Sequence, residues 1–134
     1  MTPAGKPAAK QGDLVVGLDT HVLMMPSPGG PVPTPTPMPF SGKLSSELCD
    51  DVRAENKAVA VEGSVAVNNP PHIPAGGPFQ RPPANEARVQ VGSRSVLVHN
   101  KPLARLGDQA FTCGDPVDGL NGRVVSTSTV LVGD

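Results

Sequence analysis

Apolar and polar side chains alternate along much of this chain, most regularly within the stretch VGSRSVLVHNKPLARLGDQAFTC, residues 91–113. Between Ser95 and Asn100, successive side chains therefore point to opposite faces of an extended strand. Asn100-Lys101-Pro102 interrupts this strand, because proline lacks an N–H group and asparagine tolerates turn geometry. A second apolar run, Leu103–Leu106, ends at a Gly-Asp pair. The pattern predicts a hairpin that is followed by a charged turn.

Similar alternation predicts extended segments elsewhere in the chain. Strands are expected at Leu14–Val16 and His21–Met25, joined by Gly17–Thr20, and at Lys57–Val67 and Arg123–Val132. Residues 45–53 are the exception, because a serine could cap a helix there and acidic residues would suit its positive end. The sequence thus predicts an all-β chain with at most one short helix of one or two turns.

Prolines occupy every second position from Pro31 to Pro39. In an extended segment all these rings face one way, but a central strand cannot lose so many N–H donors. The segment Pro26–Pro39 is therefore expected to form an edge strand or a polyproline-like strap. A flexible linker is an alternative. A ligand for proline-binding domains is a weaker one, because no basic residue closely flanks the prolines.

Two short phrases recur within the chain. Residues 64–71 (SVAVNNPP) align without a gap with residues 95–102 (SVLVHNKP), and residues 7–13 (PAAKQGD) align with residues 102–108 (PLARLGD). Such repeats indicate hairpin-like units that pack around a common axis. Chance similarity is the alternative, since the chain is rich in valine and proline.

Composition limits how the fold can be stabilised. The 134 residues are enough for one small domain, 1–134, which cannot contain a large core. Three phenylalanines are the only aromatic residues, while 17 prolines and 15 glycines bring the chain close to the composition of disordered segments. A metal ion, a disulfide or a partner subunit is therefore expected to contribute to stability.

Charge and hydropathy argue against several classes of function. The formal net charge is −1 and the basic residues are scattered, so nucleic-acid binding is not expected. The first residues contain no apolar segment typical of a secretory signal, and no apolar run is long enough to span a membrane. Synthesis in the cytoplasm is the expectation, with Cys49 and Cys113 reduced.

The phrases PAAKQGD, EGSVAVNNPP and GSRSVLVHNKPLARLGD, followed by a cysteine, resemble the PAAR-repeat family of spike-tip proteins in contractile injection systems. The run PSPGGPVPTPTPMPF is similar to the proline-rich signature of PAAR-like proteins. The resemblance covers most of the chain, and residues 41–57 and 78–87 are its least familiar parts.

The resemblance implies a small cone of short β-hairpins with approximate threefold symmetry. Its base would sit on a trimeric β-helical spike protein, and a type VI secretion system or phage-tail-like particle would drive the assembly into a target membrane. Effector cargo would then bind non-covalently, since no toxin domain is visible. The chain departs from the simplest family pattern at the proline strap and at residues 41–57, which leaves the first half of the cone in doubt.

The resemblance also implies a structural metal site. Cys113 stands where PAAR-like sequences carry a metal ligand, and the chain contains three histidines, His21, His72 and His99. Three imidazoles and one thiolate would form a closed tetrahedral shell that suits zinc, although the same ligands also accept iron. Taken alone, the three histidines could equally be ordinary surface or half-buried residues, because their spacing matches no zinc-finger phrase. Cys49 is expected to pack as a small hydrophobic residue.

Three functions remain open at this point. The leading one is a structural piercing tip that caps the spike and is stabilised by zinc near its vertex. The second is a zinc hydrolase, disfavoured because the shell has no open position and the chain has no H-E-x-x-H phrase. The third is a proline-rich extracellular adhesion or interaction module. No catalytic residue is predicted.

Overall fold

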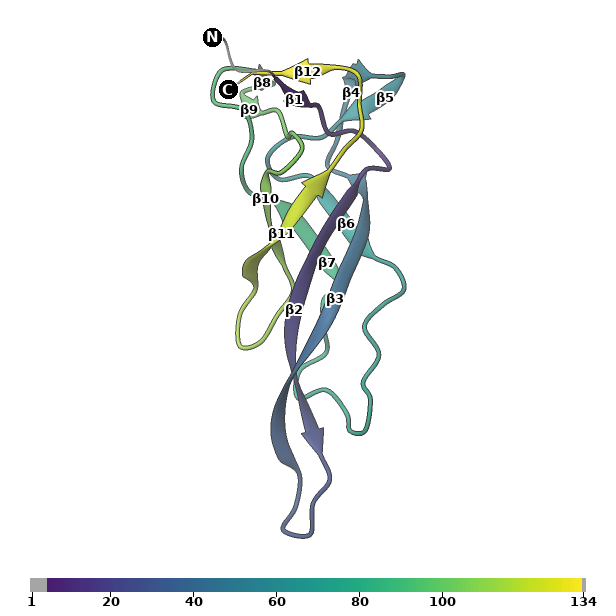
Figure 1. The fold of residues 1–134 in the computed structure, drawn as a ribbon, viewed down its shortest axis with the longest axis vertical. Helices are drawn as coiled ribbons and strands as arrows, with labels where there is room; N and C mark the ends of the chain where they lie inside the picture. Colours follow the sequence, from purple (N-terminus) through teal and green to yellow (C-terminus); the bar gives the residue numbers. More distant parts are fainter. Residues whose placement is uncertain (1–4, 134) are drawn as a thin grey trace.

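The computed structural model describes residues 5–133 and shows an all-β fold, without a helix in that range (Figure 1). In chain order the strands are β1 (Lys6–Pro7), β2 (Leu14–Met25), β3 (Val32–Ser46), β4 (Cys49–Ala54), β5 (Lys57–Val59), β6 (Val65–Asn68), β7 (Glu86–Val89), β8 (Leu97–Val98), β9 (Lys101–Pro102), β10 (Gln109–Thr112), β11 (Gly119–Val125) and β12 (Leu131–Val132). Accordingly, the described residues include no helix that could cross a membrane.

Three antiparallel hairpins form the body of the molecule. They are β2–β3, β6–β7 and β10–β11, and they close into a barrel in the order β10-β11-β2-β3-β6-β7. The β2–β3 hairpin is the longest and extends beyond the others at one end of the molecule (Figure 1). The loops of the two shorter hairpins point toward that same end. The fold therefore tapers from a broad end to a single long hairpin.

A ring of three alanines closes the barrel at the broad end. The backbone N–H of Ala9 donates to the carbonyl of Ala104, Ala104 to Ala60, and Ala60 back to Ala9, each at 2.9 Å. All three side chains are fully buried. Each alanine thus contributes one donor and one acceptor to a cyclic arrangement, which gives this end of the barrel approximate threefold symmetry.

The chain leaves each ring alanine through an equivalent turn. Three residues after each alanine lies a glycine with a φ of 85–94°, a conformation that glycine adopts without the steric cost of a Cβ atom. One residue later, a side-chain oxygen accepts the backbone N–H of the residue that follows the alanine. The donor–acceptor pairs are Lys10–Asp13 at 3.0 Å, Val61–Ser64 at 2.9 Å and Arg105–Asp108 at 2.8 Å.

Of the two repeats seen in the sequence, only one corresponds to this threefold symmetry. Residues 7–13 and 102–108 occupy equivalent positions in the ring, so that repeat is structural. Residues 64–71 begin in barrel strand β6, whereas residues 95–102 form the small β8–β9 hairpin outside the barrel. The similarity of this second pair has no structural counterpart. The third ring segment, around Ala60, carries no phrase that matched the other two.

Three two-stranded sheets, β1–β12, β4–β5 and β8–β9, lie around the broad end (Figure 1). Each exposes an apolar side chain: Leu131 is 59% exposed, Leu97 53% and Val52 39%. Cys49 is half-buried in β4 and packs against the small apolar cluster beneath these sheets, as the sequence suggested.

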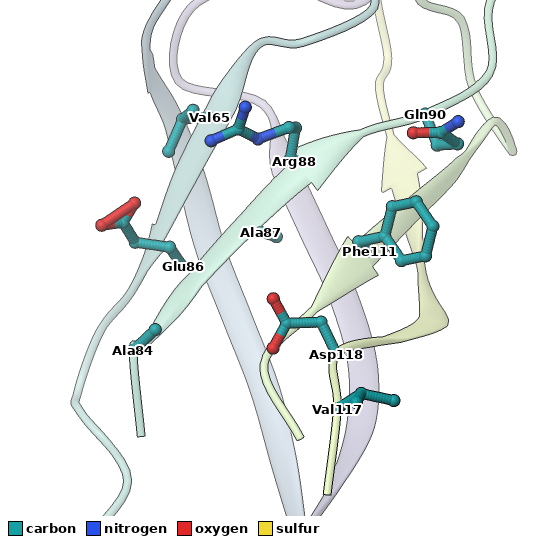
Figure 2. A pocket seen from close by; sticks show the side chains of 9 residues that line it. All are labelled: Val65, Ala84, Glu86, Ala87, Arg88, Gln90, Phe111, Val117 and Asp118. Atoms are coloured by element: carbon teal, nitrogen blue, oxygen red, sulfur yellow. The ribbon is translucent and has the colours of Figure 1, made fainter. Parts of the chain in front are cut away.

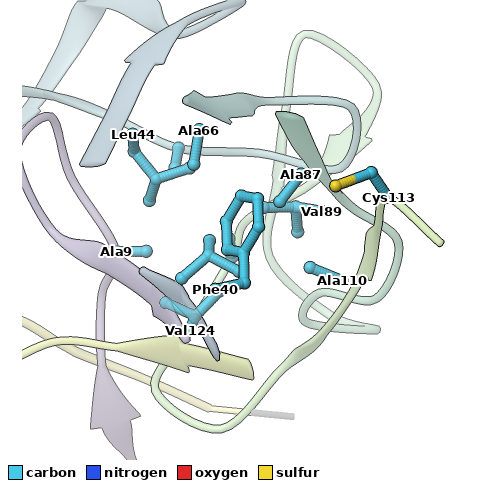
Figure 3. Packing of buried hydrophobic residues seen from close by; sticks show 12 residues of the cluster. Ala9, Phe40, Leu44, Ala66, Ala87, Val89, Ala110, Cys113 and Val124 are labelled. Atoms are coloured by element: carbon cyan, nitrogen blue, oxygen red, sulfur yellow. The ribbon is translucent and has the colours of Figure 1, made fainter. Parts of the chain in front are cut away.

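Small aliphatic side chains and one aromatic ring fill the barrel. Phe40 points inward from β3 and is surrounded by alanines and valines from other segments and by Leu44 of its own strand (Figure 3). Ala66, Ala87 and Ala110 are among its neighbours, and all are buried. A narrow barrel accommodates a phenylalanine only where the facing residues are small. The core is therefore thin, as the composition predicted.

The first half of the chain corrects two predicted elements. Residues 14–25 form one continuous strand, so the expected connection at Gly17–Thr20 is wrong. A Cβ atom at Gly17 would lie 2.6 Å from the carbonyl oxygen of Asn121, so this glycine allows the close approach of β11 rather than a turn. The expected helix at 45–53 is also wrong. That segment ends β3 and begins β4, because pairing with β6 and β5 outweighs its weak helical preference.

Two of the predicted long strands are divided in the structure. The segment expected as one strand at Lys57–Val67 forms β5 and β6, separated by a turn at Gly63. Likewise, Arg123–Val132 contributes the end of β11 and all of β12, and residues 126–130 connect them. Both breaks occur where the chain passes between the barrel and a small sheet at the broad end.

Of the alternating prolines, Pro33–Pro39 lie on the outer face of β3 and Pro31 precedes it, and the expected edge strand is confirmed for residues 32–39. Beyond the short pairing of Gly42–Ser46 with β6, β3 pairs only with β2. The N–H and C=O groups of Val22 bond to Asp115 and Gln80, away from β3, so its partner Pro35 needs no N–H toward β2. Pro33 and Pro37 lie two residues to either side of Pro35 along β3, so their nitrogen atoms face the same way as that of Pro35. Their missing donors therefore all face the open edge, where no ladder is broken.

Candidate metal centre

Four potential metal ligands converge inside the narrowing half of the molecule. Asp19 and His21 are two residues apart on β2 and so face the same way, into the barrel. His72 comes from the loop between β6 and β7, and Cys113 directly follows β10. Their ligand atoms all lie within 4.8 Å of one another. All three hairpins of the barrel thus contribute to one group of side chains.

The distances within the group fit a tetrahedral site. Asp19 Oδ2 is 2.7 Å from His72 Nε2, 3.2 Å from Cys113 Sγ and 4.0 Å from His21 Nε2. Cys113 Sγ and His21 Nε2 are 3.5 Å apart. Zinc bonded to N, O and S ligands at its usual lengths would separate neighbouring ligand atoms by roughly 3.3–3.6 Å. Small side-chain adjustments would therefore bring the four atoms to zinc-binding positions.

The metal-free group is poorly satisfied by the protein itself. The Asp19, His21 and Cys113 side chains are almost completely buried, and the His72 side chain is 3% exposed. Within the described residues, Asp19 Oδ1 and His21 Nδ1 have no hydrogen-bond partner. Burial of a carboxylate beside unpaired polar atoms is unfavourable unless a cation or further hydrogen bonds compensate. These observations show a buried group that could hold a metal ion.

Burial also controls the protonation of two members of the group. Desolvation raises the pKa of the Cys113 thiol to about 12, and the hydrogen bond and negative charge of Asp19 add to the increase. Desolvation and the neighbouring His72 lower the pKa of His21, against the opposing effect of Asp115 and Asp19. His21 is therefore neutral near pH 7, as a metal ligand must be, whereas Cys113 would lose its proton only when a cation replaces it.

Asp115 faces His21 from outside the group. Its Oδ2 accepts the backbone N–H of Val22 at 2.8 Å and lies 3.6 Å from His21 Nδ1. Arg81 donates to the other carboxylate oxygen at 3.1 Å. A carboxylate that faces the non-ligating nitrogen of a histidine is the usual outer partner of a metal-bound imidazole. The Phe79 ring stands edge-on to the His21 ring, with centroids 5.8 Å apart, and covers it.

The structure brings together three of the four predicted ligands and separates the fourth. His21, His72 and Cys113 belong to the group, whereas His99 lies in the two-residue turn between β8 and β9, at the broad end (Figure 1). Its φ is 51°, and its Nε2 bonds to Asp51 Oδ2 at 2.6 Å with both side chains exposed. His99 is thus a surface residue in this structure, and the expectation that it completes the shell needs correction.

Asp19 takes the fourth place, and sequence reasoning missed it. The available signal was the phrase Asp19-Thr20-His21, because residues two apart on a strand share a face. The predicted connection at residues 17–20 placed Asp19 outside a strand, so its shared face with His21 was not recognised. Once β2 is seen as continuous, a carboxylate beside His21 follows directly from strand geometry.

His72 of the metal group also lines a surface pocket, beside Met38, Asn68 and Ile73. A second pocket, of ≈ 630 Å³, lies over β7 and β10 and is lined by Glu86, Arg88, Phe111 and Asp118 among others (Figure 2). It contains none of the four grouped side chains and combines opposite charges with apolar surface. The four candidate ligands therefore do not form the wall of this pocket.

Comparison of the chain with family models, curated proteins and solved structures finds no match.

Proposed function

We propose that this protein is the structural piercing tip of a contractile injection system, of the PAAR-like kind, which caps and sharpens a trimeric β-helical spike. The observation that carries the proposal is the closure of three hairpins around one axis, by the alanine ring at the broad end and by side chains from all three hairpins further along. A tapering body tied together at both ends suits a load-bearing role.

The broad end suits a trimeric partner. The ring of Ala9, Ala60 and Ala104 gives it approximate threefold symmetry, and short strands surround the ring. Exposed Leu97 and Leu131 offer apolar contacts there, while the strand edges could extend the sheets of a β-helical spike. Production in the cytoplasm, assembly into the particle and ejection with it, together with non-covalent effector cargo, belong to the same proposal.

Zinc is the ion we propose for the metal centre. A dication bound by Asp19, Cys113 thiolate and two neutral imidazoles gives a site of zero net charge, which favours burial. Bound zinc would supply a closed, redox-inert crosslink between the three hairpins. Iron is the alternative ion for this ligand set. The closed shell also favours a structural role over hydrolysis, which needs an open coordination position.

The proline-rich interaction module is the less favoured alternative. Most of the alternating prolines belong to β3, and twelve residue pairs join that strand to β2. A segment held in this way does not present the free polyproline helix that proline-binding domains recognise.

Two measurements test the proposal. Native mass spectrometry of the full chain mixed with the spike trimer of the parent machine should show one chain per trimer. Leu131→Asp should weaken this complex, whereas the same change at Ile73, which is 74% exposed in the β6–β7 loop, should not. Elemental analysis should find about one zinc per chain. Failure to bind the trimer, or equal loss with both variants, would contradict the proposed orientation on the spike.

A further inference from the structure

Asn85 contacts two residues of the metal group through two different parts of its structure. It immediately precedes β7 and has a φ of 56°, in the left-handed region that side-chain-bearing residues rarely adopt. Its backbone N–H bonds to the sulfur of Cys113, and its side-chain Oδ1 accepts the backbone N–H of His72 at 2.9 Å. One residue outside the group is therefore bonded to ligands from two different hairpins.

Asn85 also closes the long loop that carries His72. Asn68, at the end of β6, donates its backbone N–H to the Asn85 carbonyl at 2.8 Å and its Nδ2 to Asn85 Oδ1 at 3.2 Å. These two asparagines flank the loop formed by residues 69–84. Because His72 lies in that loop and not on a strand, its position depends on how the loop is anchored at its ends.

The backbone conformation of Asn85 directs its bonds to Cys113 and His72. Asparagine is among the few non-glycine residues that tolerate the left-handed region, and such outliers often occur at functional sites. Asn56 and Asn100 have similar φ values of 69° and 65°. Those two lie in the turns of the small sheets β4–β5 and β8–β9, where a left-handed residue serves only the turn. The contacts, and not the φ value alone, distinguish Asn85.

We propose that Asn85 is a positioning residue of the metal centre, which sets His72 and Cys113 in place for the ion. Its N–H directs a hydrogen bond at the sulfur that must become a thiolate, and its side-chain oxygen holds the loop that presents the second imidazole. Outer residues of this kind orient ligands and raise metal affinity. The inference rests on the proposed metal centre and adds a residue that the ligand pattern alone does not reveal.

Substitutions at Asn85 separate its backbone role from its side-chain role. Asn85→Gly keeps the left-handed backbone and the bond to Cys113 but removes the anchor of His72. Asn85→Asp keeps the left-handed backbone and also the anchor of His72, because aspartate tolerates this conformation and offers the same acceptor. Asn56→Gly is the matched control, with the same residue change at a similar φ in a small sheet at the broad end.

The experiment titrates each full-length variant with Co²⁺, follows the thiolate-to-cobalt absorption band, and then measures zinc affinity by competition with a chelator. Asn85→Gly should bind zinc about 10–100-fold more weakly. Asn85→Asp and Asn56→Gly should bind like the parent chain. The melting temperatures of the metal-free variants should differ little, since the loss concerns ligand placement. If the glycine variant does not fold, Asn85→Ser replaces it, because the serine hydroxyl is too short to reach the His72 N–H. Asn56→Ser is then the control, since serine carries the same steric cost of a left-handed φ at both positions.

Three outcomes would overturn the inference. Parent-like zinc affinity in Asn85→Gly would show that the His72 anchor is dispensable. Equally weak binding by Asn85→Asp would show that the acceptor is not the feature that matters. No metal binding by the parent chain would remove the metal centre itself, a result that the parent titration distinguishes from the other two.

Discussion

The two ends of the barrel are closed by different chemistry. At the broad end, Ala9, Ala60 and Ala104 join the three hairpins through backbone hydrogen bonds alone. In the narrowing half, the same three hairpins meet through four side chains of three different types. Backbone closure constrains only the small ring residue and the turn that follows it, so the other positions of the three ring segments can differ in sequence. Side-chain closure requires particular residues, and it loses the threefold symmetry because β2 supplies two of the four groups.

This difference predicts unequal dependence on a metal ion. The ring is satisfied without any cofactor, because each backbone donor has its acceptor and each bond contributes about 1 kcal/mol net. The side-chain group instead buries the Asp19 carboxylate with an unpartnered oxygen. Such a group stabilises the fold only when a cation or proton compensates its charge. The narrowing half should therefore be the metal-dependent end of the molecule.

Metal removal should have the largest effect. A structural zinc ion contributes on the order of 10 kcal/mol to folding in small domains, so chelation should sharply lower the melting temperature. His21→Ala and Cys113→Ser should lose the metal and melt like the chelated parent chain, with no further change on chelation. The check combines elemental analysis with thermal unfolding. A parent chain that contains no metal and melts at the same temperature with chelator would refute the dependence.

An enlarged ring residue should have the next largest effect. Ala60→Leu places three extra carbons where the three hairpins meet and the side chain is fully buried, which should cost about 3 kcal/mol of unfolding free energy. Chemical denaturation of the metal-loaded proteins measures this change. Ala75→Leu, at an exposed loop position, is the control and should change stability by less than about 0.5 kcal/mol. Similar effects of the two substitutions would mean that the ring is not tightly closed.

A rise of one pH unit above 9 should weaken the metal-free chain by a smaller amount. The Cys113 pKa rises from 9.0 to about 12 on folding, so the unfolded chain releases this proton at lower pH than the folded chain. Stability from this group is complete below pH 9 and should fall by about 1.4 kcal/mol per pH unit above it. At the acid end, the lowered His21 pKa means that the unfolded state binds a proton more readily, so stability should also fall below about pH 6.5.

Cys113→Ser provides the test of the alkaline limb. Unfolding free energies of the chelator-treated parent and variant should run parallel up to pH 9 and diverge above it, because serine does not titrate in this range. An identical alkaline decline in both proteins would assign the effect to other groups.

Loss of His99 should have the smallest effect. Its ion pair with Asp51 is exposed, and such pairs contribute between zero and about 1 kcal/mol. His99→Ala should therefore retain the full metal content and lose less than about 0.5 kcal/mol of stability. His72→Ala, at the metal group, should lose affinity for the ion. Loss of zinc from His99→Ala would restore the ligand set that the family resemblance implied.

The sequence by itself determined the features that depend on local periodicity and composition. Alternation predicted an all-β chain, and the thin core followed from the scarcity of aromatic residues. The regular spacing of Pro31–Pro39 predicted an edge strand or a polyproline-like strap, because proline has no N–H to donate. The resemblance to PAAR-like phrases selected His21, His72 and Cys113, which the fold brings together.

Only the tertiary structure decided which residues share a level along the barrel axis. Strand periodicity reveals the face on which a side chain lies, but not its distance from the broad end or the strands beside it. The side chains around His99 alternate as regularly as those around His21, yet His99 lies in the turn between β8 and β9, on the surface at the broad end. Asp19 and Asn85 acquire their roles because three hairpins, distant in sequence, close around one axis and bring their side chains and loop ends together.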